Sequence, residues 1–339
     1  MKFLPLKIPN NETIDAIERI KLFGIIAVIL LHAIPRPWLN KIYAPYHIWQ
    51  AVPVFMVLAG VTATLSEIRS GSQFVSFGYF LASFFRKARR ILIPFTVIWI
   101  VQLLMNLLYY SRPIDRDWLF SWFRGGYGPG SYFTSVYIQH LAIFPFISFL
   151  DRQLQVVNLA MRMTVWLILA LAIDYICLLI LMPEWLYRLF YGRYILAVVI
   201  GMWLVRYRPS TSLGTICFAF GIAYLTVSSY FSWNPSFSYP AWIMQHAPVY
   251  FYSAGILLLL WYLPPVVCRL TDTLLVLGRA SYHIFLVQMV YFWFGHKPLK
   301  IYFGINMSIP IALIICCSIG AIFYIAETNI QKKLYCREK

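Results

Sequence analysis

The chain has 339 residues, of which 61% are hydrophobic and only 12% are charged, and its mean hydropathy is +0.72. This composition excludes an ordinary soluble domain and predicts a polytopic membrane protein with a single domain over residues 1–339. The net charge of +16 is interpreted as loop charge on the inner side of a lipid bilayer, with a phosphate-bearing ligand as the alternative, and not as a nucleic-acid site.

Apolar segments long enough to cross the bilayer recur along the whole chain, since a crossing takes about 20 helical residues. Ten are predicted, at 20–37, 46–66, 91–110, 131–150, 163–182, 190–205, 212–231, 248–267, 280–296 and 306–326. About two thirds of the 28 Lys and Arg residues fall in the termini and the even-numbered loops, so both termini are predicted to be cytoplasmic. The predicted fold is an all-α bundle of about ten transmembrane helices in the cell membrane.

The first predicted span carries two titratable residues, Lys21 and His32. Eleven positions of an α-helix give about 20° beyond three full turns and a rise of about 16 Å, so both side chains share one face. A lysine at a helix start often reaches the interface, and a lone histidine is often a packing residue. Ionisable residues within a span are nevertheless costly and usually functional. The pair is typical of a site for a long ligand with an anionic head and a reactive end near an imidazole.

The segment 72–90, between the second and third spans, has apolar residues at helical spacing and basic residues at its end. The apolar positions are Phe74, Phe77, Leu81, Phe84 and Phe85, and the basic ones are Arg86, Lys87, Arg89 and Arg90. This pattern predicts an amphipathic helix that lies in the cytoplasmic interface and brings four cations to the inner membrane surface.

The third and seventh loops, on the predicted outer side, are rich in aromatic residues. The third contains Trp118, Trp122, Tyr127 and Tyr132 among glycines, and the seventh has five aromatic residues between 231 and 242 and no Lys or Arg. Interfacial anchoring explains such loops. The alternative is a carbohydrate surface, because flat rings stack on the apolar faces of sugars. On that alternative, we expect Trp122, Tyr127, Tyr132 and Gln139 to bind an acceptor saccharide.

The remaining titratable residues form no recognisable metal motif. Asp174 lies alone in the fifth span, and a functional role and pairing with a neighbouring Arg or Tyr stay as alternatives. The six cysteines lie mostly in apolar runs and are interpreted as core residues. We therefore expect no metal site and no permanently bound cofactor.

Five segments, in order, resemble the membrane acyltransferase 3 superfamily. Lys21-x10-His32 resembles its signature of a basic residue followed by a histidine, and FFRKARRILIPF (84–95) resembles its basic stretch. VPVFMVLAG (52–60) resembles its second-span pattern with Ala59 in place of serine. GPGSYFTSVYIQHLAIFPF (128–146) is similar to its fourth-span entry, and LGRASYHIFLVQMVYF (277–292) resembles a late motif in which a histidine often stands in place of Gln288.

The resemblance implies an O-acyltransferase that moves an acyl group, usually acetyl, from cytoplasmic acyl-CoA to a hydroxyl of a cell-surface or exported saccharide. It implies that His32 is the catalytic base. It further implies that Lys21 and the four cations Arg86, Lys87, Arg89 and Arg90 bind the phosphates of acyl-CoA, with acetyl-CoA as the donor substrate.

Two other hypotheses stay open. One is an exporter or flippase for the saccharide, which also suits ten spans and an aromatic outer surface. The other is a non-catalytic member of the same family, because Ala59 lacks a hydroxyl and Gln288 lacks the acid–base chemistry of a histidine.

Overall fold

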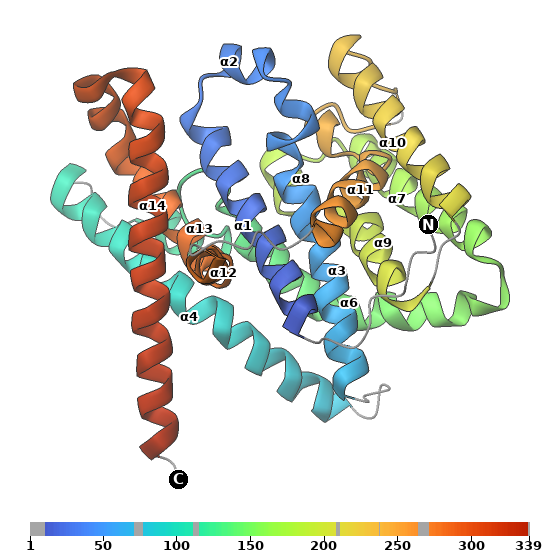
Figure 1. Ribbon diagram of the computed structural model, residues 1–339, viewed down its shortest axis with the longest axis horizontal. Helices are drawn as coiled ribbons and strands as arrows, with labels where there is room; N and C mark the ends of the chain where they lie inside the picture. Colours follow the sequence, from blue (N-terminus) through green and yellow to red (C-terminus); the bar gives the residue numbers. More distant parts are fainter. Residues whose placement is uncertain are drawn as a thin grey trace.

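The computed structural model of this protein describes residues 11–70, 77–110, 115–207, 211–236, 238–263 and 271–337, and all regular elements in these ranges are helices (Figure 1). The α-helices are α1 (Asn11–Ala33), α2 (Arg36–Lys41), α3 (Ala51–Ser70), α4 (Phe77–Tyr110), α5 (Arg116–Phe123), α6 (Tyr132–Gln153), α7 (Leu159–Leu179), α8 (Glu184–Leu189), α9 (Ile195–Arg206), α10 (Thr211–Tyr230), α11 (Val249–Tyr262), α12 (Thr271–Arg279), α13 (Ser281–Val290) and α14 (His296–Arg337). Short 3-10 turns are η1 (Ala44–Tyr46), η2 (Ile48–Gln50), η3 (Leu154–Val156), η4 (Tyr191–Tyr194) and η5 (Ile243–Gln245), and η6 (Tyr291–Gly295) is a π-helical turn. The predicted all-α class is confirmed.

Six helical segments within the described ranges are long and apolar enough to cross a membrane. They are Ala44–Ser70, Phe80–Tyr109, Tyr132–Val156, Leu159–Leu179, Thr211–Tyr230 and Ser281–Lys333. The predicted count of ten is not confirmed. The first predicted span, 20–37, falls on α1, which is not among the six, and α9 and α11 have 12 and 14 residues, whereas a full crossing takes about 20. The ninth and tenth predicted spans both fall in the last segment, where α14 is broken at Gly304 (φ 75°, ψ 170°) and the chain turns back (Figure 1).

The helix α4 runs without interruption from Phe77 to Tyr110 and crosses beneath α1 and α3 in Figure 1. The separate interfacial helix predicted over 72–90 is therefore not confirmed, since its described part is continuous with the third predicted span. Pro94 lies inside the helix and cannot donate a hydrogen bond to the carbonyl of Arg90, yet α4 continues through it. Residues 71–76, including Phe74, lie outside the described ranges.

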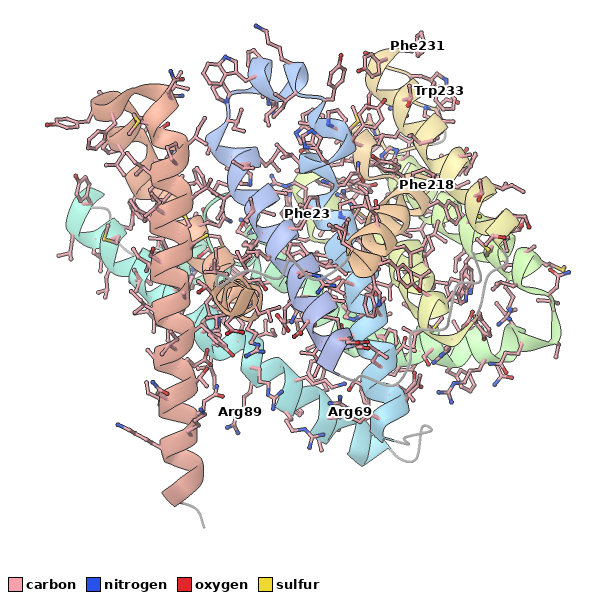
Figure 2. All side chains as sticks on the ribbon, viewed as in Figure 1. Phe23, Arg69, Arg89, Phe218, Phe231 and Trp233 are labelled. Atoms are coloured by element: carbon pink, nitrogen blue, oxygen red, sulfur yellow. The ribbon has the colours of Figure 1, made fainter. Side chains whose placement is uncertain are left out.

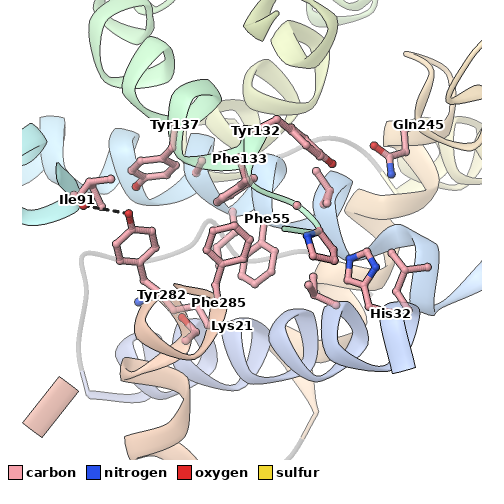
Figure 3. A pocket seen from close by; sticks show the side chains of 18 of the residues that line it. Lys21, His32, Phe55, Ile91, Tyr132, Phe133, Tyr137, Gln245, Tyr282 and Phe285 are labelled. Carbon is pink, nitrogen blue, oxygen red and sulfur yellow. Dashed lines mark hydrogen bonds between the residues drawn. The ribbon is translucent and has the colours of Figure 1, made fainter. Parts of the chain in front are cut away.

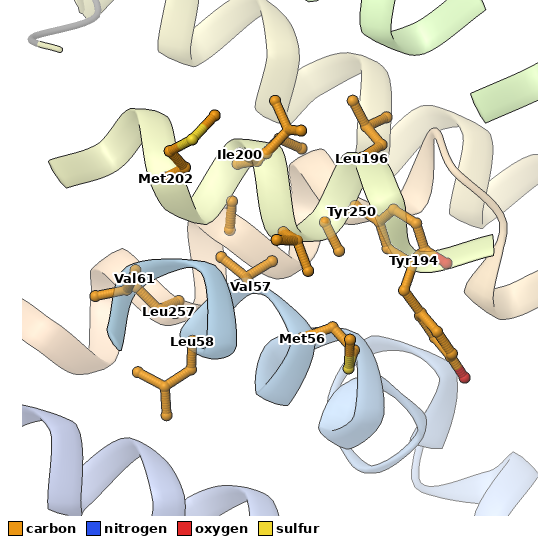
Figure 4. Close-up of a cluster of buried hydrophobic side chains, with 14 of the residues drawn as sticks. Met56, Val57, Leu58, Val61, Tyr194, Leu196, Ile200, Met202, Tyr250 and Leu257 are labelled. Atoms are coloured by element: carbon orange, nitrogen blue, oxygen red, sulfur yellow. The ribbon is translucent and has the colours of Figure 1, made fainter. Parts of the chain in front are cut away.

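The centre of the molecule is the contact between α3 and α9, whose apolar side chains face one another (Figure 4). Two glycines let the backbones approach closely. A Cβ atom on Gly60 would lie 2.1 Å from the carbonyl oxygen of Val198, and one on Gly201 would lie 2.0 Å from that of Val57. Small residues are typical of helix pairs in membranes, where close packing supplies the attraction that the hydrophobic effect does not.

Ion pairs tie α3, α6 and α9 together at the C-terminal ends of these helices. Glu67 pairs with both Arg152 and Arg206, and the buried carboxylate of Asp151 lies 3.6 Å from Arg206. The indole of Trp203 donates a further hydrogen bond to Asp151 at 2.8 Å. Because a buried charge without a partner is costly, these contacts are needed to hold the carboxylates inside the bundle.

Two of the arginines and two aromatic residues mark opposite ends of the molecule. Arg69 and Arg89 project at one end, and Phe231 and Trp233 lie at the other (Figure 2). We call the end of Arg69 and Arg89 the basic end and the end of Phe231 and Trp233 the aromatic end, and α1 runs from the first toward the second (Figure 1).

We expect Gly201→Ala to lower the midpoint of thermal unfolding of the purified protein by several degrees. The added methyl group would force α3 and α9 apart, and overpacking of this kind costs about 1–3 kcal/mol. Gly214→Ala on α10 is the matched control, because a Cβ there would meet nothing within 4 Å. Equal midpoints for the two variants would contradict the backbone contact between α3 and α9.

Candidate functional site

A cavity of about 460 Å³ lies between α1 and α3 (Figure 3). The rest of its wall comes from Ile91 of α4, the loop residues Pro129 and Gly130, the first residues of α6, α8, the segment around η5, and the pair α12 and α13. Lys21 stands at one end, on the side of Tyr282, and His32 stands at the other, on the side of Gln245 (Figure 3). Most of the wall between these ends is apolar, so the cavity suits a long ligand with polar groups at its ends.

The helix α1 supplies one side of this cavity through residues that share a face. Lys21, Val28, Leu31 and His32 all line it. Eleven positions of helix separate the two titratable residues by about 16 Å along the axis. The structure therefore brings Lys21 and His32 to one cavity, as their spacing predicts.

The imidazole of His32 packs against an aromatic ring. It packs edge-on against Phe292, with the ring centroids 5.7 Å apart. In the part of the chain that the structure describes, no group is hydrogen-bonded to His32. Its ring is accessible from the cavity, so a nitrogen is available to accept a proton from a bound hydroxyl.

The opposite end of the cavity carries two cations. Lys21 forms an ion pair with Glu18, with Nζ 3.0 Å from Oε1, and is therefore partly neutralised. Arg279, at the end of α12, also lines the cavity and is exposed. Arg279 was not predicted from the sequence, although it lies within the segment 277–292.

The predicted basic cluster borders the cavity without lining it. Arg86, Arg89 and Arg90 are exposed and Lys87 is half-buried, whereas the next residue, Ile91, belongs to the wall. The carbonyl of Ile91 accepts a hydrogen bond from the Tyr282 hydroxyl at 3.0 Å. This hydrogen bond holds the C-terminal end of the basic cluster at the rim of the cavity, on the same side as Lys21 (Figure 3).

A glycine-rich loop closes the cavity against α13. Gly128 has φ +105°, and a Cβ atom there would lie 2.4 Å from the carbonyl oxygen of Met289, so only glycine fits. The buried side chain of Gln288 donates a hydrogen bond to the carbonyl of Pro129 at 2.9 Å. Pro129 and Gly130 are thereby held in the cavity wall.

Of the four predicted acceptor-binding residues, Tyr132 lines the cavity, whereas Trp122, Tyr127 and Gln139 do not. The indole of Trp122 donates to the Thr96 hydroxyl at 3.1 Å. The ring of Tyr127 packs against Trp118, with centroids 4.3 Å apart, and its burial raises the pKa of the phenol.

The amide of Gln139 links α6 to the segment that follows α8. Its nitrogen donates to the carbonyl of Leu189 at 2.7 Å, and its oxygen accepts from the N–H of Tyr191 at 3.1 Å. Leu189 follows Arg188, which lines the cavity. Gln139 therefore positions the segment that carries a cavity cation.

Three residues at the His32 end were not selected from the sequence, namely Arg188, Trp242 and Gln245. Trp242 belongs to the aromatic seventh loop, so that pattern was a usable signal for it. Arg188 and Gln245 stand in no motif, and only packing brings them to the cavity.

The isolated carboxylate of Asp174 is paired within the bundle. It accepts a hydrogen bond from the Tyr187 hydroxyl at 2.6 Å and lies 3.9 Å from His246. His140 is likewise a buried residue, whose ring nitrogen lies 3.1 Å from the hydroxyl of Tyr191. Of the two alternatives for Asp174, the structure shows pairing with a tyrosine.

A family model described as an acyltransferase domain matches residues 14–327 of this chain. The matched range includes every residue that lines the cavity. No curated protein and no solved structure matches the chain.

We expect Gln139→Ala to lower the midpoint of thermal unfolding, because it removes two hydrogen bonds that each contribute about 1 kcal/mol. Gln155→Ala is the matched control, since that amide makes a single exposed contact at 3.3 Å with Tyr207. Calorimetry of both variants in detergent checks the difference. An unchanged midpoint together with weaker use of the acceptor would instead support the predicted acceptor contact of Gln139.

Proposed function

This chain belongs to the membrane acyltransferase 3 family, and we propose that it transfers an acetyl group from cytoplasmic acetyl-CoA to a hydroxyl of a cell-surface or exported saccharide. Acyl transfer by a multi-pass membrane protein follows from the family and from the long apolar helices. The donor, the acceptor, the cell membrane as location, ten spans and cytoplasmic termini are parts of the proposal.

The observation that best supports the proposal is that Lys21 and His32 line one and the same cavity (Figure 3). A ligand that extends along it has to be long and narrow, with few charges in its middle. The pantetheine arm of CoA has this form. With the CoA phosphates at the Lys21 end, the arm would direct the thioester toward His32.

The basic end of the molecule suits the phosphates of CoA. Arg86, Arg89 and Arg90 are exposed beside the cavity rim, and Lys21 and Arg279 lie within it. Guanidinium groups donate paired hydrogen bonds to phosphate oxygens. An excess of Lys and Arg on this side also favours its cytoplasmic location, where acyl-CoA is available.

In the proposed reaction, His32 acts as the general base. Its free ring nitrogen accepts the proton of the acceptor hydroxyl while the hydroxyl oxygen attacks the thioester carbonyl. The tetrahedral intermediate then collapses with cleavage of the carbon–sulfur bond. The departing CoA sulfur takes the proton from the imidazolium, so that His32 returns to its neutral form and the acetyl ester is released.

The acceptor would enter from the aromatic end of the molecule. Tyr132 and Trp242 line the cavity at the end of His32, and flat rings suit the apolar faces of sugar rings. Donor and acceptor would thus reach His32 from opposite sides of the bilayer.

The proposal is tested by incubating the purified full chain in lipid nanodiscs with radiolabelled acetyl-CoA and surface glycans from the source cell. Label that enters the glycan fraction and is released by mild alkali would support O-acetylation. Absence of label from every glycan fraction would contradict the proposed function.

We expect His32→Ala to reduce acetyl transfer at least about a hundredfold, because general-base catalysis typically contributes 10²–10⁴-fold. Binding of acetyl-CoA and the unfolding midpoint should change little. His47→Ala is the control, because His47 lies outside the cavity and its Nε2 contacts the carbonyl of Ile42 at 2.6 Å. If His32→Ala retains more than about a tenth of the rate, a general base at this position is excluded.

We expect the double substitution of Arg86 and Arg89 by Gln to raise the KM for acetyl-CoA and to leave the KM for glycan nearly unchanged, because only phosphate contacts are removed. Substitution of Lys332 and Lys333 by Gln, two exposed cations at the end of α14, is the matched control for charge. Steady-state kinetics against both substrates checks this expectation. An unaltered acetyl-CoA KM in the first variant would contradict a phosphate site at the rim.

A further inference from the structure

The end of the cavity beside His32 holds a cation without an anionic partner. Arg188 lines the cavity, and its guanidinium lies over the rings of Tyr132 and Trp242, 5.5 Å and 5.4 Å from their centroids. In the described part of the chain, Arg188 forms no hydrogen bond and no ion pair, and its Nε is buried. Two rings therefore hold the guanidinium in place and leave its hydrogen-bond donors unused.

The nearby acids are already engaged elsewhere. Glu184, one turn before Arg188 on α8, accepts a hydrogen bond from the indole of Trp242 at 3.3 Å. Asp174 is bound by Tyr187. No Asp or Glu is found among the described residues that line the cavity, so the wall offers no counter-ion for Arg188.

A second donor at this end is fixed by a buried cation. The side-chain oxygen of Gln245 accepts hydrogen bonds from Arg193 at 3.1 Å and from the Tyr194 hydroxyl at 3.4 Å. Arg193 is only 3% exposed and is further held by rings, among them that of Trp242. With its oxygen occupied, Gln245 turns its amide nitrogen toward the cavity and the side of His32 (Figure 3), and no described group accepts from that nitrogen.

The backbone of this region is also held in an uncommon conformation. Trp242 has φ +67°, in the left-handed region that bulky residues rarely adopt. Such strain persists where the surrounding structure imposes it, and it concentrates at ligand sites. Here it places one indole against both Arg188 and Arg193.

From this geometry we propose that Arg188 and Gln245 bind an anionic group, a carboxylate or a phosphate, on the acceptor saccharide. The inference rests on the proposed function. The available groups at this end are donors, and an ionised carboxylate or phosphate is a pure acceptor that matches them. The phosphates of CoA would occupy the other end, beside Lys21, so the anion at Arg188 belongs to the acceptor. The protein is thus selective for acidic glycans.

The test uses the labelling assay with radiolabelled acetyl-CoA and surface glycans of the source cell, separated by charge. We expect the label in the anionic glycans. One portion of the glycans is first treated with carbodiimide and borohydride, which reduces carboxylates to neutral alcohols, and a second portion is dephosphorylated with hydrofluoric acid. Loss of acceptor activity after the first treatment identifies a carboxylate, and loss after the second identifies a phosphate.

Variants of Arg188 separate anion binding from packing. Arg188→Gln should raise the KM for the anionic glycan about tenfold or more, as expected for the loss of a charge-assisted hydrogen bond, and should leave the KM for acetyl-CoA unchanged. Arg188→Lys should restore part of the affinity. Arg124→Gln is the matched control, because Arg124 also lies over a tryptophan, Trp185, at 5.2 Å but is outside the cavity.

Several outcomes would overturn the inference. Label in neutral glycans, or acceptor activity that survives both chemical treatments, would do so while leaving the proposed function intact. An Arg188→Gln variant that loses thermal stability and both substrate affinities together would show a packing role only. No transfer to any glycan would contradict the proposed function itself and the inference with it.

Discussion

The close contact of α3 with α9 is the constraint on which the cavity depends. Gly60 and Gly201 bring the two backbones together, and this fixes the position and rotation of α3. The opposite face of α3 carries Phe55, Leu58 and Ala59 into the cavity wall. Any displacement of α3 would therefore change the distance across the cavity to α1. In a bilayer, where helix association relies on close packing, two glycines are an effective way to set that distance.

The polar groups of the cavity wall are concentrated at its two ends. Cations and hydrogen-bond donors lie at its two ends, the middle is mostly apolar, and the described lining contains no acid. The buried acids of the bundle, Asp151 and Asp174, are engaged with partners outside it. A bound ligand is therefore expected to carry negative charge at its ends and little in its middle. His32 stands at the end opposite Lys21, and its imidazole has no hydrogen-bond partner among the described residues.

The two departures from the family pattern have structural explanations that do not remove the proposed chemistry. Gln288 is buried, and its amide nitrogen holds the carbonyl of Pro129, so it supports the loop that closes the cavity. The side chain at position 288 therefore holds this loop in place, and an amide can donate the hydrogen bond that does so. Ala59 places a methyl group in the cavity wall where the family often has a hydroxyl. That makes the wall more apolar, and His32 stays available as the proton acceptor.

The sequence by itself determined the helical membrane class, the family and the shared face of Lys21 and His32. These properties follow from composition and from the helical period, which act over short stretches of chain. It did not determine that Trp122, Tyr127 and Gln139 lie outside the cavity wall, because an aromatic or polar residue has the same sequence pattern whether it faces a ligand or another helix. Only the tertiary structure decided that Arg188, Trp242 and Gln245 meet at the cavity near His32. They come from α8 and from the segment around η5, far along the chain from α1, and their meeting depends on how the helices pack.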